Sequence, residues 1–185
     1  MLPIADALRD TSAIVVFSHG LGQEQPLTSV SFRVVCVDIS KRRYEMDHLQ
    51  RITERVSRQG DPDDENTPRP LLSLNEFFDG NECHGSIGCN LPGRPAPQEM
   101  YQALKRIADR PDVADVRVQI SQFDDPDWPF SDQVFVFTWA TPEEVLTWFS
   151  EDLRPDEAWE GFSPSVRYEA YVVPDGTRPV ACWWD

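Results

Sequence analysis

The fold is decided by two apolar segments, VADVRVQISQF (113–123) and QVFVFTWA (133–140). The first segment alternates apolar and polar side chains, which is typical of a strand with one buried face. The second segment predicts another strand. Because the connection DDPDWPFSD (124–132) is short and rich in turn-forming residues, we expect the two strands to be antiparallel neighbours.

Helical patterns lie on both sides of this pair. Apolar residues recur at helical spacing in 42–58, and Pro97 opens a second helix that runs to about Arg110. Thr141 caps a third helix, which has Pro142 at its first position. Further strands are expected at 13–18, at 29–39, at the start of 71–81 and in a hairpin of 166–173 with 178–184 around the turn PDGT.

This order of elements predicts an α+β (or α/β) fold. We expect a single domain over 1–185, with a mixed, mostly antiparallel sheet and about three helices packed on it. The segment QGDPDDENTPRP (59–70) is the clearest linker, and it also allows a subdivision into 1–58 and 71–185.

Charge is distributed unevenly along the chain. Residues 1–58 carry 8 Lys/Arg and 7 Asp/Glu, whereas residues 59–185 carry 9 and 25, which together give the formal net charge of −15. A field of this sign favours cationic partners and repels nucleic acid and anionic lipid. We therefore expect a basic protein partner, with no nucleic acid and no membrane among the partners.

The location is predicted from the apolar runs and the cysteines. The beginning of the chain, MLPIADALRD, lacks the pattern of a secretory signal, and no run approaches the ~18 apolar residues of a membrane span. The four cysteines are then expected to be reduced thiols in a cytoplasmic protein. We expect no cofactor, and the sequence does not determine the oligomeric state.

One loop carries residues that could bind a metal or act as a thiol site. ECHGSIGC (82–89) holds Cys83, His84 and Cys89, and zinc favours Cys and His ligands. A His next to a Cys could also activate a thiol. The paired ligand spacing of zinc sites is absent, however, so a loop shaped by glycines is the simpler interpretation.

Acidic residues are interleaved with tryptophan in two later segments, 124–132 and 141–160. Carboxylates could hold a cation, but the first segment lacks the Gly and Glu positions of a calcium loop. A solvated acidic turn is another alternative. Since Trp is a favoured interface anchor, we predict partner contacts at Asp124, Asp125, Asp127, Trp128, Glu157, Trp159 and Glu160.

Four phrases carry a resemblance to a known group: LSLNEFFDGN (72–81), GSIGCNL (85–91), WPFSD (128–132) and CWWD (182–185). They resemble a family of small acidic bacterial proteins marked by FF-x-GN, GSIGCN, WPFSD and WWD, and the likeness covers about 71–185. The resemblance implies no particular activity. A likeness to immunity proteins is an analogy that rests on size, acidity and a lack of catalytic residues.

These observations lead to a functional hypothesis with two alternatives. We expect a non-catalytic acidic binding protein, of the kind in which an immunity or antitoxin protein occludes the active site of a basic, nuclease-like toxin. A housekeeping or regulatory protein-interaction module is the first alternative. A metal- or thiol-dependent enzyme that uses the loop 82–91 is the second.

Overall fold

The computed structural model describes residues 39–61, 64, 66–123 and 127–185, with side chains from His48 onward. The elements follow in the order α1 (Ile39–Ser57), β1 (Leu71–Ser73), α2 (Leu74–Phe78), α3 (Pro97–Ala108), β2 (Val113–Gln119), β3 (Gln133–Thr138), α4 (Pro142–Leu146), the 3₁₀ turn η1 (Glu151–Leu153), β4 (Glu157–Glu160) and β5 (Arg178–Trp183). The strands expected at 13–18 and 29–39 lie outside the described residues.

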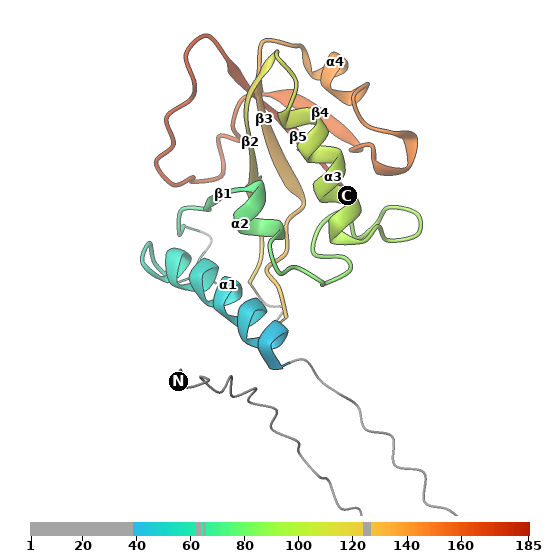
Figure 1. The fold of residues 1–185 in the computed structure, drawn as a ribbon. Helices are drawn as coiled ribbons and strands as arrows, with labels where there is room; N and C mark the ends of the chain where they lie inside the picture. Colours follow the sequence, from blue (N-terminus) through green and yellow to red (C-terminus); the bar gives the residue numbers. More distant parts are fainter. Residues whose placement is uncertain (1–38, 62–63, 65, 124–126) are drawn as a thin grey trace, which may run out of the picture. The chain divides into compact units, whose positions relative to one another are not determined.

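The described strands form one antiparallel sheet in the order β1-β2-β3-β5-β4 (Figure 1). The predicted pairing of 113–123 with 133–140 is confirmed, because β2 and β3 pair from Val113↔Thr138 to Gln119↔Gln133. Helices accompany this sheet, so the α+β prediction is confirmed.

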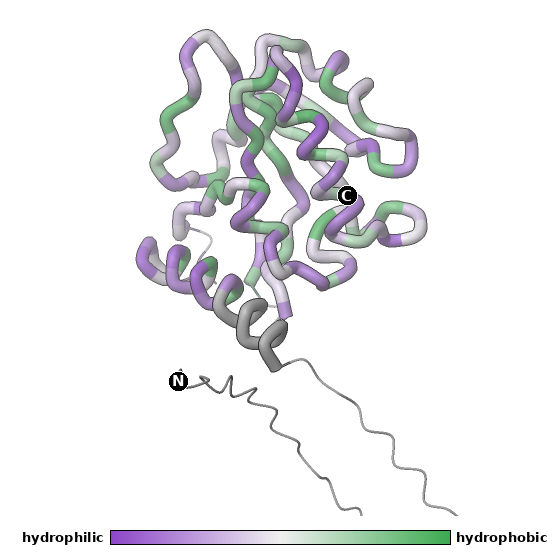
Figure 2. The backbone as a smooth tube through the Cα atoms, in the orientation of Figure 1, coloured by the Kyte–Doolittle hydropathy of each residue, from purple (hydrophilic) through white to green (hydrophobic). Residues whose placement is uncertain are grey.

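Strand β3 is buried on both faces, and this divides the interior into two cores. Val134 and Val136 point to a large core shared with α2, α3 and α4. Phe135 and Phe137 point to the opposite face, where they form a second, smaller core. Figure 2 shows hydrophobic residues along the central strands of the sheet. Successive side chains of a strand point to opposite faces, so the apolar run from Val134 to Phe137 needs cover on both sides of the sheet.

The second core is covered by residues 161–177, which contain no regular strand. Phe162, Tyr168 and Tyr171 pack on Phe135 and Phe137, with ring centroids 4.6 to 6.3 Å apart. Figure 1 shows this segment on the side of the sheet opposite α3. We call 161–177 the covering segment.

The predicted C-terminal hairpin is wrong. Strand β5 pairs with β3 along one edge and with β4 along the other, so no edge of β5 is left for 166–173. Instead, Tyr168 and Tyr171 lie over the sheet face. Strand β4 is the element missing from the expected list, and it comes from an acidic segment that has no apolar alternation.

The helices begin where local chemistry predicts. In α4, the hydroxyl of Thr141 accepts a hydrogen bond from the N–H of Glu144, and the Glu144 carboxylate accepts one from the N–H of Thr141. In α3, Pro97 occupies the first turn, and Met100, Leu104 and Ile107 are buried against the sheet. The predicted cap and the predicted helix start are both confirmed.

Helix α1 belongs to the same compact unit as the sheet. Ile52 lies in the large core, and Val56 is also buried. The described residues on both sides of the segment 59–70 therefore lie in one unit. Among the described helices, none is long and apolar enough to cross a membrane.

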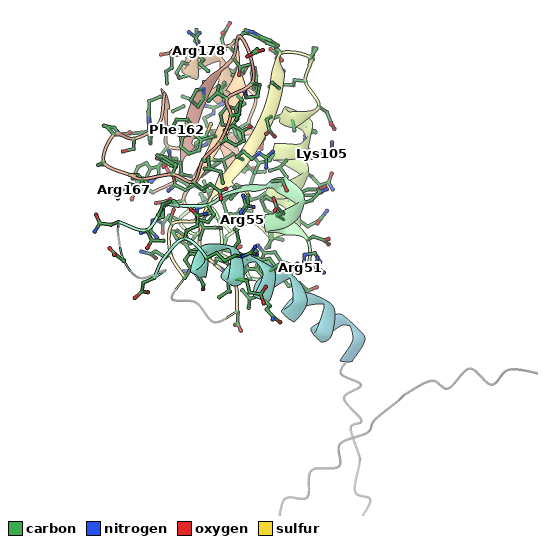
Figure 3. The ribbon with its side chains drawn as sticks, turned by 90° about the vertical axis from the view of Figure 1, so that its left-hand side faces the viewer. Arg51, Arg55, Lys105, Phe162, Arg167 and Arg178 are labelled. Atoms are coloured by element: carbon green, nitrogen blue, oxygen red, sulfur yellow. The ribbon has the colours of Figure 1, made fainter. Side chains whose placement is uncertain are left out.

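The β1 edge of the sheet is closed by side chains. The register leaves Leu71 and Ser73 with backbone groups that point away from β2. The N–H of Leu71 donates to Glu169 at 2.7 Å, the C=O of Leu71 accepts from Arg55 at 3.3 Å, and the N–H of Ser73 donates to Glu76 at 2.8 Å. Figure 3 shows Arg55 reaching from α1 toward the sheet.

Candidate partner-binding surface

The fold brings acidic residues from separate segments to one end of the sheet. Gln133, Trp183 and Glu157 are in register across β3, β5 and β4, so these strands begin or end at the same level. The acidic residues in this row or next to it in the chain are Asp132, Asp156, Glu157 and Asp185, which we call the acidic end.

Hydrogen bonds fix the acidic end. The C=O of Asp132 accepts from the N–H of Trp184 at 3.0 Å, and its carboxylate accepts from the indole of Trp183 at 3.4 Å. The hydroxyl of Ser121 also donates to this carboxylate. The N–H of Asp185 donates to the Asp156 carboxylate at 3.0 Å. These hydrogen bonds hold the carboxylates of Asp132 and Asp156 in place.

Three carboxylates of the acidic end face solvent without a cationic side chain paired to them in the described part of the chain. Asp156, Glu157 and Asp185 are exposed, and none of them forms an ion pair with an Arg or Lys of the described residues. By contrast, Glu160 pairs with Arg178 at 3.2 Å. The surface can therefore attract a cation without first breaking internal ion pairs.

The negative charge also acts on a neighbouring phenol. Burial raises the pKa of Tyr168, a hydrogen bond from the backbone of Ser163 acts in the opposite direction, and the charge of Asp132 raises this pKa further. Tyr168 belongs to the covering segment, so the acidic end and the second core are adjacent.

The structure separates the predicted contacts of β4. Residues alternate between faces along a strand. Trp159 packs beside the second core and Glu157 shares that face, whereas Ala158 and Glu160 face the large core. The three predicted residues of β4 therefore do not share one face of the sheet: Glu157 and Trp159 lie on one face and Glu160 on the other. Asp127 is exposed, and Asp124 and Asp125 lie outside the described residues.

Trp128 is not the surface anchor that the sequence suggested. Its side chain is only 3% exposed, and its indole N–H donates to the C=O of Phe77 at 3.0 Å. The neighbouring Asp127 is exposed, whereas the ring of Trp128 fills the large core. Burial of a Trp with a satisfied N–H stabilises the fold and leaves no surface for a partner.

The loop 82–91 is a compact turn and does not gather metal ligands. Cys83 packs beside the large core, and His84 Nδ1 lies 3.4 Å from the C=O of Arg94. Cys89 lies close to Gly85, which has a φ of +94°. In the part of the chain that the structure describes, no group of three or more His, Cys, Asp or Glu could hold a metal ion.

Sequence reasoning missed Asp156, Trp183 and Asp185. The register of β5 brings these residues beside Asp132, which is distant in the chain. The phrase CWWD signalled only family membership, because a strand order with β5 between β3 and β4 is not encoded locally.

The chain matches known sequences over most of its length. The family model described as "Uncharacterized protein YfbO family" matches residues 47–182. The "Uncharacterized protein YfbO" of Escherichia coli (strain K12) is 50% identical over 140 residues, which are 76% of this chain and 100% of that protein. The chain belongs to the YfbO family. No solved structure matches it.

The resemblance found in the sequence is thereby confirmed, and the YfbO match begins at residue 47 rather than 71. The four phrases that carried it meet in the fold. WPFSD contacts NEFF through Trp128 and Phe77, and it contacts GSIG through the N–H of Ser131 and the C=O of Ser86 at 2.8 Å. It contacts WWD through Asp132, as described above. These four phrases of the chain therefore form one junction beside the acidic end.

Proposed function

We propose that this protein is a non-catalytic acidic binding protein that recognises a basic protein partner through the acidic end. The observation that carries the proposal is the convergence of exposed carboxylates from the ends of β4 and β5 at one end of the sheet. Their charge would steer a cationic partner during encounter and set its orientation. We expect the complex to form in the cytoplasm, the location that the sequence predicts.

Aromatic surface beside the charges would contribute to retention of the partner. Trp183 and Trp159 are half-buried, lie on the same face of the sheet as Glu157 and stand on neighbouring strands. Half-buried Trp beside charged groups is typical of positions that dominate binding energy in interfaces. We therefore infer that carboxylates govern association and that these rings govern dissociation.

The test begins with a pull-down from native lysate at low and at moderate salt, read by mass spectrometry. A single basic protein retained at moderate salt supports the proposal. Recovery of only abundant basic proteins, all lost as salt rises, contradicts it and assigns the acids to solvation. If the retained protein is a toxin, the protein acts in immunity; if it is an endogenous non-toxic protein, the protein is a regulatory module.

The retained partner then allows a matched comparison. Glu157→Lys reverses one charge at the acidic end, whereas Asp175→Lys makes the same change in net charge beyond the opposite end of β5. At low salt we expect Glu157→Lys to slow association about 3- to 10-fold, since charges at an interface act mainly on the on-rate. Asp175→Lys should leave the rate within about twofold. Equal rates for the two variants would place the interface elsewhere.

A further inference from the structure

The two edges of the sheet differ in a way that bears on how a partner binds. As described above, side chains of Arg55, Glu76 and Glu169 close the β1 edge. At the other edge, the N–H of Gly161 donates to the C=O of Pro179 at 2.8 Å. Hydrogen-bonded and non-hydrogen-bonded pairs alternate in an antiparallel ladder, so Glu157 and Trp159 direct their backbone groups toward β5.

It follows that Ala158 and Glu160 direct their N–H and C=O groups outward. Within the described residues, nothing forms a hydrogen bond to these four backbone groups. Glu160 is exposed and Ala158 is half-buried. Helix α4 lies against both β4 and β5, and its Val145 is buried in the large core that Ala158 also faces. Strand β4 is therefore an edge strand on which two residues have unpaired backbone groups.

The charges beside this edge oppose self-association. Antiparallel pairing of two β4 strands through their outward groups allows few registers. Centring the pair on Glu160 sets two copies of this residue opposite each other, and centring it on Ala158 sets Glu160 opposite Asp156. In the register between them, the two copies of Glu160 are diagonal neighbours. Like charges in these positions are destabilising.

A strand that carries Lys or Arg would instead be attracted to the acidic side chains beside this edge. Its backbone would complete the hydrogen bonds of Ala158 and Glu160, and its cationic side chains would lie beside Asp156, Glu157 and Glu160. We propose that the basic partner docks an extended, Lys/Arg-bearing segment on β4 as a sixth strand of the sheet. This inference rests on the proposed function and adds the mode of recognition to it.

The test uses the full chain and a blocked nine-residue peptide in which Lys alternates with Val or Thr. Hydrogen exchange of individual amides is measured by NMR with and without the peptide. We expect exchange at Ala158 and Glu160 to slow at least tenfold on binding, because their N–H groups become paired. The amide of Trp159 is already paired with β5 and serves as the internal control.

A backbone variant provides a second measurement. Ala158→Pro removes the outward N–H and retains the bonds to β5, whereas Ala158→Ser keeps the N–H. We expect Ala158→Pro to weaken peptide binding at least tenfold and Ala158→Ser to bind within twofold of the parent. Should Ala158→Pro fail to fold, the exchange result on the parent chain decides alone.

Three results would overturn strand addition. They are peptide binding with unchanged exchange at Ala158 and Glu160, equal binding by folded Ala158→Pro and Ala158→Ser, and no peptide binding at low salt. The proposed function is judged separately by the lysate partner and by Glu157→Lys. If Glu157→Lys slows association of the partner but Ala158→Pro does not change its binding, the acidic end remains the proposed interface and only strand addition is refuted.

Discussion

Glu169 offers the sharpest test of how the covering segment is held. Its side chain is 13% exposed, and its carboxylate accepts from three groups on two other segments. Arg55 of α1 donates through Nε at 3.2 Å and also through Nη2, Gln59 donates at 3.0 Å, and the N–H of Leu71 donates at 2.7 Å. One carboxylate thus joins α1, β1 and a segment that has no regular structure.

The expected loss in the free energy of unfolding depends on which hydrogen-bonding groups each substitution leaves unpaired. Glu169→Ala leaves the buried N–H of Leu71 without an acceptor, which costs about 1–3 kcal/mol, and it removes the charged acceptor of Arg55. Arg55 is 29% exposed and keeps Glu76 at 2.8 Å, so water and that carboxylate recover part of the loss. We expect Glu169→Ala to lower the free energy of unfolding by about 3 kcal/mol, the lower end of the ~3–5 kcal/mol typical of a broken buried pair. Glu169→Gln keeps an acceptor for Leu71 and should cost about 1–2 kcal/mol.

Urea unfolding followed by fluorescence of the six Trp residues measures these differences. Glu76→Gln is the matched control, because Glu76 also pairs with Arg55 but is 48% exposed, and it should cost about 0.5 kcal/mol. A Glu169→Ala protein that unfolds within about 0.5 kcal/mol of the parent would refute the reasoning and show that the covering segment is held by its aromatic rings alone.

Three further outcomes are expected. Trp128→Phe removes the hydrogen bond to Phe77 and part of the ring volume, so urea unfolding should show a loss of about 1–3 kcal/mol, with the association rate of the partner unchanged. Burial and the hydrogen bond to Asp115 raise the pKa of Tyr171 to about 12, above its ordinary value of 10.0. The folded state therefore holds this proton longer than the unfolded state, and stability should fall as pH rises from 10 toward 12, with a smaller fall in Tyr171→Phe. Burial also raises the pKa of the Cys182 thiol to about 12, so iodoacetamide at pH 8 should modify Cys182 only in urea, as mass spectrometry of native and unfolded protein would show.

The sequence predicted those parts of the fold in which local pattern and tertiary environment agree. Alternation in 113–119 specified a strand, and the short connection to 133–138 specified its partner. The cap at Thr141 and the Pro at 97 specified helix starts, because both act within one turn.

The parts that the sequence did not predict depend on the strand order. The turn PDGT suggested that 166–173 pairs with 178–184, but β5 already has a neighbour on each side. The segment EAWE (157–160) has no alternation to mark it as β4, and it forms a strand because β5 offers an unpaired edge. Trp128 was placed on the surface from the charge of its neighbours, although the position of Phe77 decides its burial.

The closed β1 edge limits how many chains one sheet can join. A fibre needs two open edges on every copy, one to receive a strand and one to offer the next. Here Arg55, Glu76 and Glu169 occupy one of them, so the sheet can be extended in a single direction only. Any assembly built by strand pairing through this sheet must therefore stop at one added strand per chain, with a stoichiometry of one to one.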